Sequence, residues 1–196
     1  MFELSSKTKV DRRFRLAELY KIAVADKQVK ENAKNILSVV LTNVLSQETM
    51  NIPAGDKVKE IYIFNIELSS KTIPALFISS LDKEINLHTV FVFSCGEEVA
   101  LYACYKEISA KGVKLGKYYS TDWAKPQPPV PLPLTVASMD DIYTAFIDEL
   151  IPIAAKESET TTDFVARYDK IEKLKIAIAK KQRQVDNERQ SKKRFE

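Results

Sequence analysis

Glycine, cysteine and histidine are all scarce in this 196-residue chain, which has four glycines, two cysteines and one histidine. Neither a GxGxxG nor a GxxxxGK[ST] phosphate loop is present. A structural zinc site needs about four Cys or His ligands, so none is expected. No apolar run reaches the about 18 residues of a transmembrane helix, and the N-terminus resembles no secretory signal. The sequence therefore predicts a cytoplasmic protein without cofactor, metal or membrane contact.

The few residues suited to nucleophilic catalysis are also poorly placed. Cys95 and Cys104 lie in apolar, strand-like segments. This predicts two buried, reduced thiols, although a disulfide across the intervening turn is geometrically conceivable. Cys95 follows His88 by seven residues on one predicted strand, so the two side chains would point to opposite faces about 23 Å apart. A catalytic Cys–His pair is not expected.

Charge is unevenly distributed along the chain. Residues 163–196 contain 11 basic and 6 acidic side chains, a net charge of +5. Because the whole chain carries +3, the preceding 162 residues carry −2. An acidic body with a basic C-terminal segment is typical of a protein with an interaction tail.

Hydrophobic periodicity predicts an α/β (α+β) body followed by a long helix. The proline-rich stretch 125–133 is expected to be an extended connector, because proline interrupts both helices and central strands. A mixed four-stranded sheet flanked by helices is predicted over 1–155, then a hinge over 156–162 and a basic helix over 163–196. The expected helices of the body span 11–25, 26–46, 72–84 and 138–152, and the expected strands span 58–68, 88–95, 99–106 and 113–120.

The C-terminal helix contains a partial heptad repeat. One seam is apolar in four of five positions, whereas the seam three residues later is apolar in only two of five. Such a half-built seam favours docking on another helix or another chain, and homo-oligomerisation through the same seam is an alternative. The predicted partner-binding residues are Phe164, Ile171, Leu174, Ile178 and Val185.

Basic side chains surround this seam. They match a weak, sequence-independent contact with nucleic-acid phosphates, although a solvated helix face would have the same composition. The candidate nucleic-acid-binding residues are Lys180, Lys181, Arg183, Arg189, Lys192, Lys193 and Arg194.

Two further groups are candidate sites. A diverged metal-dependent nuclease would use Glu60, Glu67 and Lys106, although the chain lacks the (D/E)xK triplet on the second strand. The segment Tyr118-Tyr119-Ser120-Thr121-Asp122-Trp123 contains the only tryptophan. Its Tyr118, Tyr119, Asp122 and Trp123 are a possible surface site for a base or a partner pocket, unless Trp123 fills the core.

Four segments together resemble a bacterial and archaeal family catalogued as a domain of unknown function. Gln47 and the pair Asn86-Leu87 depart from its usual pattern, and neither departure affects an evident catalytic group. The resemblance implies genes placed beside helicases and DNA methyltransferases in restriction or phage-defence loci. The segments are LSQETMNI at 45–52, VKEIYIFNIEL at 58–68, LDKEINLHTVFVF at 81–93 and YYSTDW at 118–123.

The leading hypothesis from the sequence is a non-enzymatic adapter subunit of a DNA-acting complex. The body would be a folded platform, and the C-terminal helix would dock a helicase or methyltransferase with its basic side chains near DNA. A diverged nuclease and a homo-oligomeric structural protein are the alternatives.

Overall fold

A computed structural model describes residues 2–110, 112–133, 136–151, 153, 156 and 159–193, and describes no side chain for 161 and 186–193. Internal contacts divide the chain into a body, Met1–Pro152, and a C-terminal unit, Ile153–Glu196. The helices are α1 (Leu16–Ile22), α2 (Lys27–Asn32), α3 (Gln47–Met50), α4 (Ala75–Lys83), α5 (Met139–Leu150) and α6 (Thr161–Lys193), with a short 3-10 turn at Ser6–Thr8.

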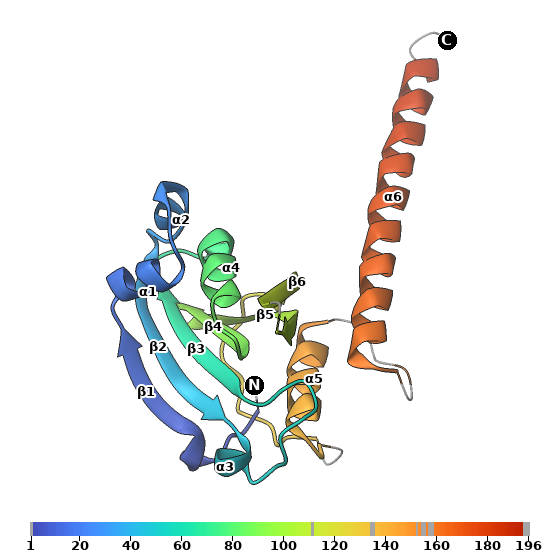
Figure 1. The fold of residues 1–196 in the computed structure, drawn as a ribbon. Helices are drawn as coiled ribbons and strands as arrows, with labels where there is room; N and C mark the ends of the chain where they lie inside the picture. Colours follow the sequence, from blue (N-terminus) through green and yellow to red (C-terminus); the bar gives the residue numbers. More distant parts are fainter. Residues whose placement is uncertain are drawn as a thin grey trace. The chain divides into compact units, whose positions relative to one another are not determined.

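The body is built on a curved sheet whose strands are ordered as in the sequence (Figure 1). Neighbouring strands pair antiparallel except β3 and β4, which are parallel and joined by the crossover helix α4. The predicted mixed sheet is confirmed, but it has six strands rather than four. The strands are β1 (Lys9–Phe14), β2 (Ile36–Leu45), β3 (Ile61–Leu68), β4 (His88–Cys95), β5 (Glu98–Ser109) and β6 (Gly112–Ser120).

The two missing strands lie where the sequence predicts helices over 11–25 and 26–46, and this prediction is wrong in large part. The first segment divides into β1 and α1, and the second into α2 and β2. The β-branched residues of β2 form a ladder with β1 on one side and β3 on the other. Pairing on both sides outweighs the local helical pattern.

Irregular pairing explains why β2 resembles a helix in sequence. Its fully buried residues Ile36, Val39, Leu41 and Leu45 are separated by three, two and four positions. Two register shifts against β3, next to Ile36 and between Leu41 and Asn43, interrupt the strict alternation of a strand. The spacings of three and four positions between buried residues of β2 are also those found on one face of a helix, so the segment resembles a helix in sequence.

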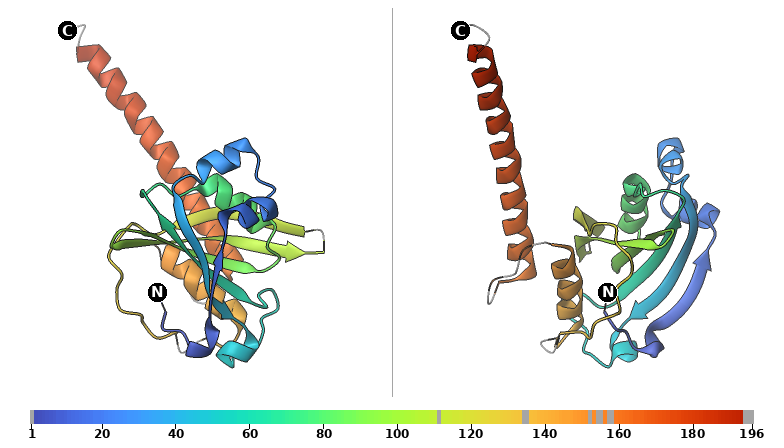
Figure 2. Two further views of the ribbon diagram at one scale, coloured as in Figure 1. Left: turned by 90° about the vertical axis from the view of Figure 1, so that its left-hand side faces the viewer. Right: turned by 180° about the vertical axis from the view of Figure 1, so that it is seen from behind.

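Helices cover both faces of the sheet (Figure 2). On one face α1, α2 and α4 enclose an aromatic core in which Phe64 stacks on Phe91. On the other face lies α5, whose N-cap is Ser138, and the Ser138 hydroxyl accepts the Asp141 amide as the sequence predicts. The inward side of α5 contributes Met139, Ile142, Tyr143, Phe146, Ile147 and Leu150, all buried.

The remaining strands and connections agree with the sequence. The hairpin of β4 and β5 is confirmed, and so is β6. Gly116 marks the expected close approach, since a Cβ there would lie 2.6 Å from the Tyr105 carbonyl oxygen. The stretch 125–133 forms no helix or strand, and only an isolated bridge joins Val130 to Phe2.

The C-terminal unit consists mainly of the predicted long helix, α6. At its start the Thr160 hydroxyl accepts the Asp163 amide at 3.2 Å. Arg167 forms two hydrogen bonds of 2.7 Å with the Glu159 carboxylate. These contacts fix the first two turns of the helix.

Candidate functional site

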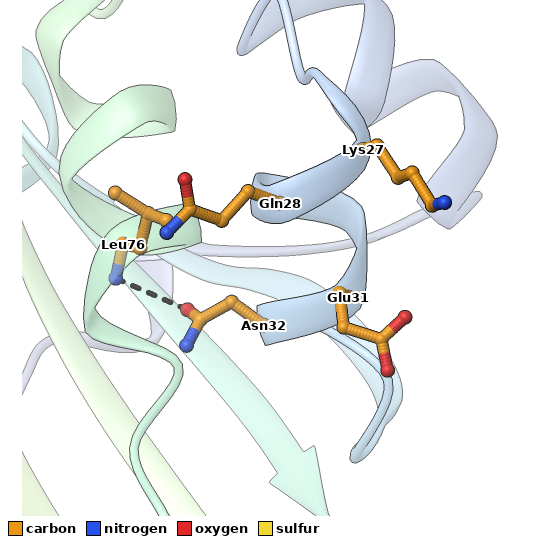
Figure 3. Close-up of a pocket in the computed structure, with 5 residues that line it drawn as sticks. All are labelled: Lys27, Gln28, Glu31, Asn32 and Leu76. Atoms are coloured by element: carbon orange, nitrogen blue, oxygen red, sulfur yellow. Dashed lines mark hydrogen bonds between the residues drawn. The ribbon is translucent and has the colours of Figure 1, made fainter.

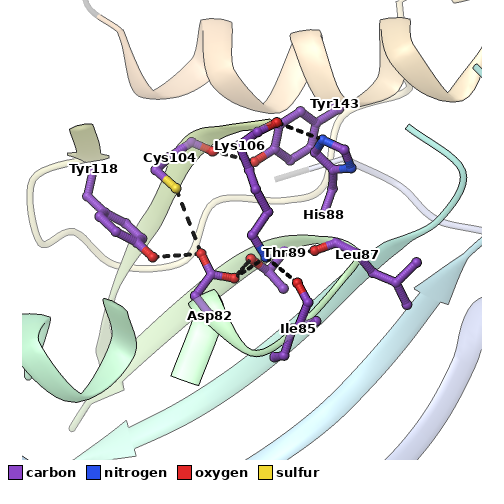
Figure 4. Close-up of polar contacts among 9 residues, drawn as sticks. All are labelled: Asp82, Ile85, Leu87, His88, Thr89, Cys104, Lys106, Tyr118 and Tyr143. Atoms are coloured by element: carbon purple, nitrogen blue, oxygen red, sulfur yellow. Dashed lines mark hydrogen bonds and ion pairs between the residues drawn. The ribbon is translucent and has the colours of Figure 1, made fainter. Parts of the chain in front are cut away.

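The polar centre of the body is the carboxylate of Asp82 on α4 (Figure 4). Four side chains from β4, β5 and β6 converge on it. Thr89 Oγ1 donates to Oδ1 at 2.5 Å, and Lys106 Nζ pairs with the same oxygen at 2.6 Å. Tyr118 OH donates to Oδ2 at 2.6 Å, and Cys104 Sγ lies 3.7 Å from it. We call these five residues the Asp82 cluster.

Lys106 is fully engaged by this cluster. Its ammonium group also donates to the Ile85 and Leu87 carbonyl oxygens, at 2.9 and 2.8 Å. An ammonium has three donors, and all three are therefore used. The side chains of Lys106 and Asp82 are 0% and 1% exposed, so the ion pair is closed to solvent.

His88 and Tyr143 extend the cluster to α5. Tyr143 OH donates to the Cys104 carbonyl at 2.5 Å, and its ring meets the His88 ring edge-on at 4.7 Å. His88 Nε2 donates to the Lys106 carbonyl, 3.1 Å away. Burial lowers the pKa of His88 to about 4, so the imidazole is neutral at pH 7.

The chemistry of the cluster is that of a structural network. Burial raises the pKa of the Cys104 thiol to about 12, with the Asp82 charge adding to the effect, so no thiolate forms at pH 7. Lys106 has no free donor, and Asp82 and Thr89 are buried. Cys95 is half-buried, and both cysteines are free, so no disulfide forms. The network holds α4, three strands and α5 in register without offering a nucleophile.

The three residues of the nuclease alternative do not converge. Glu60 and Glu67 are seven residues apart along β3 and its approach, which is about 23 Å of extended chain. Glu60 is half-buried and Glu67 is exposed. Glu67 accepts a hydrogen bond from Ser38 at 3.1 Å, whereas Lys106 is buried against Asp82. Among the residues that the structure describes, no group of three or more His, Cys, Asp or Glu is placed to hold a metal.

The predicted aromatic surface from Tyr118 to Trp123 does not form as one patch. Tyr118 belongs to the Asp82 cluster and stacks on Tyr102, with ring centroids 4.7 Å apart. Tyr119 is buried, and Trp123 packs half-buried against the core. Of the four candidate residues, only Asp122 is exposed. These side chains mainly fill the body, which is the alternative that the sequence leaves open for Trp123.

The predicted partner-binding seam on α6 is largely exposed. Phe164 is buried and Ile171 is half-buried. Further along, Leu174, Ile178 and Val185 are 55%, 66% and 42% exposed. At about 100° per residue these last three share one side of the helix with Ile171. An apolar strip therefore runs along the outer part of α6, and we call Ile171, Leu174, Ile178 and Val185 the α6 seam.

The predicted nucleic-acid-binding residues divide into two groups. Lys180, Lys181 and Arg183 are exposed and make no ion pair within the described part of the chain. By helical geometry Lys180 and Arg183 lie roughly opposite the α6 seam, whereas Lys181 lies beside it. The side chains of Arg189, Lys192 and Lys193, and the whole of Arg194, lie outside the described residues.

Two features of the structure have little or no signal in the sequence. The side chain of Ile176 is 68% exposed and lies on the Lys180 side of α6. It is not part of the heptad repeat that defines the seam, so the repeat does not predict it. Asp82 looks like an ordinary helix-surface acid, because nothing local shows that strands will bury it. Its only signal is its position directly after the buried residue Leu81.

An open pocket lies between α2 and α4 (Figure 3). Asn32 Oδ1 accepts the amides of Leu76 and Phe77, both at 3.1 Å, and so caps α4 in place of the predicted Thr72. Lys27, Gln28 and Glu31 line the rest. With its best-placed polar atom used as a helix cap, the pocket offers no convergent group for catalysis.

The chain is a small α+β protein. The ion pair at the centre of its body is closed to solvent and fully hydrogen-bonded, and its C-terminal helix is largely exposed. Within the described part, no helix is both long and apolar enough to cross a membrane. The chain belongs to the family described as Domain of unknown function (DUF4391), which matches residues 2–196. Comparisons with curated proteins and with solved structures give no match.

Proposed function

We propose that this protein is a non-enzymatic adapter that docks a partner protein through α6. The observation that carries the proposal is the α6 seam, where Leu174, Ile178 and Val185 stay more than two-fifths exposed. Apolar side chains aligned on one side of a helix fit the groove or the helix face of a partner. Burying each of them contributes roughly 1.5–3 kcal/mol, enough for a stable complex when several act together.

The body supports this reading because its polar chemistry is internal. The groups that could serve as acid, base or nucleophile in the Asp82 cluster are hydrogen-bonded to one another, and all are buried except Tyr118, which is half-buried. A protein whose polar groups are engaged internally would act by binding a partner at its surface. The family resemblance implies that the partner is a helicase or a DNA methyltransferase, and restriction or phage defence is the proposed setting.

Lys180 and Arg183 add a second contact to this proposal. Because they lie opposite the α6 seam, a partner bound to the seam leaves them uncovered. Exposed cations on a helix contact nucleic-acid phosphates without reading base edges. The adapter would thus hold its partner on one side and weakly contact DNA on the other.

Capture from the native host tests the docking role. The baits are the full chain, the variant Ile171→Ser/Leu174→Ser/Ile178→Ser, and the matched control Ile176→Ser on the opposite side of α6. We expect the full chain and the control to retain a helicase or methyltransferase, identified by mass spectrometry, and the seam variant to lose it. Equal capture by all three baits would contradict the proposal.

The oligomeric state separates the adapter from the homo-oligomer alternative. Light scattering coupled to size exclusion measures the mass of the purified full chain and of the seam variant. A monomeric full chain agrees with a seam reserved for another protein. A dimer that dissociates in the seam variant would instead assign the seam to a second copy.

A further inference from the structure

The edge strand β1 and its flanks hold the densest run of positive charge in the body. Five basic residues lie within nine positions, with Asp11 as the one acid among them, which gives this stretch a charge of +4. The first 162 residues as a whole carry −2, so the rest of the body is clearly acidic. The five residues, which we call the basic edge, are Lys7, Lys9, Arg12, Arg13 and Arg15, and all are exposed.

The position of β1 leaves these charges accessible. It is the outermost strand and pairs with β2 alone, so its other side is open (Figure 1). No residue of the basic edge makes an ion pair within the described part of the chain. The Arg12 guanidinium lies 4.8 Å from the centre of the Phe14 ring, which restrains it at the edge.

The register places the charges on both sides of the sheet edge. Arg12 pairs with Leu41, which is buried in the aromatic core, and Arg13 pairs with Val40 on the opposite face. Successive residues of a strand point to opposite faces. The cations therefore follow one another along the edge, whose extended part from Lys9 to Phe14 alone spans roughly 16 Å, and this suits an extended polyanion lying along it. They do not converge on one point, as a site for a small anion would require.

We propose that the basic edge binds the phosphate backbone of a nucleic acid. Charge of either sign would protect an open edge from pairing with another strand, so protection alone does not explain a run of positive charge in an acidic body. Three of the five residues are arginines, whose planar guanidinium matches phosphate oxygens. This site lies in the body and is separate from the α6 residues of the proposed function, on which it does not depend.

Addition of a partner strand to β1 is disfavoured by the backbone. The pairing of β1 with β2 shifts between Lys9 and Arg12, and Asp11 adopts φ of 49°. A bulge with a left-handed residue interrupts the regular row of amides and carbonyls that strand addition needs. Recognition at this edge therefore relies on side chains.

Contacts of this kind have a measurable salt dependence. Five phosphate contacts predict a slope of log affinity against log salt of about −4.5 on duplex DNA and about −3.5 on a single strand. Because no side chain is placed to read base edges, affinity should be independent of sequence.

Fluorescence anisotropy with labelled 20-nucleotide single strands and 20-base-pair duplexes tests the proposal, using the full chain at about 50 to 200 mM salt. The edge variant is Lys9→Gln/Arg12→Gln/Arg13→Gln. The matched control, Lys27→Gln/Lys30→Gln/Lys34→Gln, removes the same charge from exposed positions on α2 and in the turn that follows it. We expect the edge variant to bind at least tenfold more weakly at about 50 mM salt, with the slope flatter by about two to three. The control should change affinity less than threefold.

Two further variants keep the test decisive. Arg12→Lys/Arg13→Lys keeps the charge and should retain most of the binding, which separates loss of contact from loss of folding. Lys180→Gln/Lys181→Gln/Arg183→Gln reports the contribution of α6. Partner capture should be unchanged by the edge variant, so failure at the edge and failure of the adapter role are distinguishable.

Several outcomes would overturn the proposal. These are no measurable binding by the full chain at about 50 mM salt, equal losses in the edge variant and its matched control, and loss in the α6 variant alone. Poly-glutamate that displaces the oligonucleotide at equal charge concentration would assign the edge to an acidic protein instead.

Discussion

At the centre of the body charged side chains are buried and paired, whereas on α6 both charged and apolar side chains are exposed. In the body, Asp82 and Lys106 are enclosed with all their partners in place. On α6, Lys180 and Arg183 are exposed, and so is Ile178. A buried charge that is fully paired stabilises one arrangement of the fold, whereas exposed groups are available to a partner. Polar residues thus maintain structure at the centre of the body, whereas those on its surface and on α6 are exposed, and for these we propose a role in recognition.

The largest expected effect follows from removing the charge at the centre of the body. Asp82→Asn leaves the Lys106 ammonium buried without a counter-ion, and Thr89 and Tyr118 lose a charged acceptor. We expect the free energy of unfolding to fall by about 3–5 kcal/mol, measured by urea denaturation.

The double variant Asp82→Asn/Lys106→Met sharpens this result. Removing both charges leaves no unpaired ion, so its loss of stability should be clearly smaller than the sum of the two single losses. If the stability loss of the double variant equals the sum of the two single losses, the pairing of Asp82 with Lys106 contributes nothing to stability.

Acid should weaken the body through His88. Its pKa is about 4 when folded against 6.5 when free, so the unfolded state binds more protons between these values. Stability from His88 is therefore complete above about pH 6.5 and is lost as the pH falls toward 4, by up to about 3 kcal/mol. Urea denaturation from pH 7 to 4.5 should show a steeper loss in the wild type than in His88→Gln. Parallel curves would exclude His88 as the cause.

The cap of α4 provides an intermediate effect with an internal control. Asn32→Ala removes the acceptor of two α4 amides and should cost about 1–2 kcal/mol of unfolding free energy. Thr72→Ala removes a hydroxyl that makes no cap and should cost less than about 0.5 kcal/mol. If Thr72→Ala lowers the free energy of unfolding more than Asn32→Ala does, in thermal or urea unfolding, then Thr72 is the cap of α4, as the sequence predicts.

The smallest effect is expected on α6. Leu174→Ser/Ile178→Ser changes two side chains that are more than half exposed. Urea unfolding of the body, followed by its single tryptophan Trp123, should shift by less than about 0.5 kcal/mol. A loss comparable to that of Asp82→Asn would mean that α6 stabilises the body, and the contrast between the two regions would fail.

The sequence alone determines the elements whose signals are local. The hairpin of β4 and β5 follows from two β-rich runs around Gly96-Glu97, and α5 follows from the Ser138 cap and its apolar face. The charge and the apolar seam of α6 are likewise visible in the sequence. Each of these features rests on residues close together in the chain, so periodicity and capping suffice to find them.

Tertiary structure alone decides the rest. Whether 36–45 is helix or strand depends on its pairing with β1 and β3, and the register shifts of β2 mask its alternation. The Asp82 cluster joins α4 to residues up to 36 positions away, so no local pattern marks Asp82, Lys106 and Tyr118 as partners. The basic edge becomes a surface only because β1 is the outermost strand. Long-range pairing determines burial and exposure, and these determine what each charged residue does.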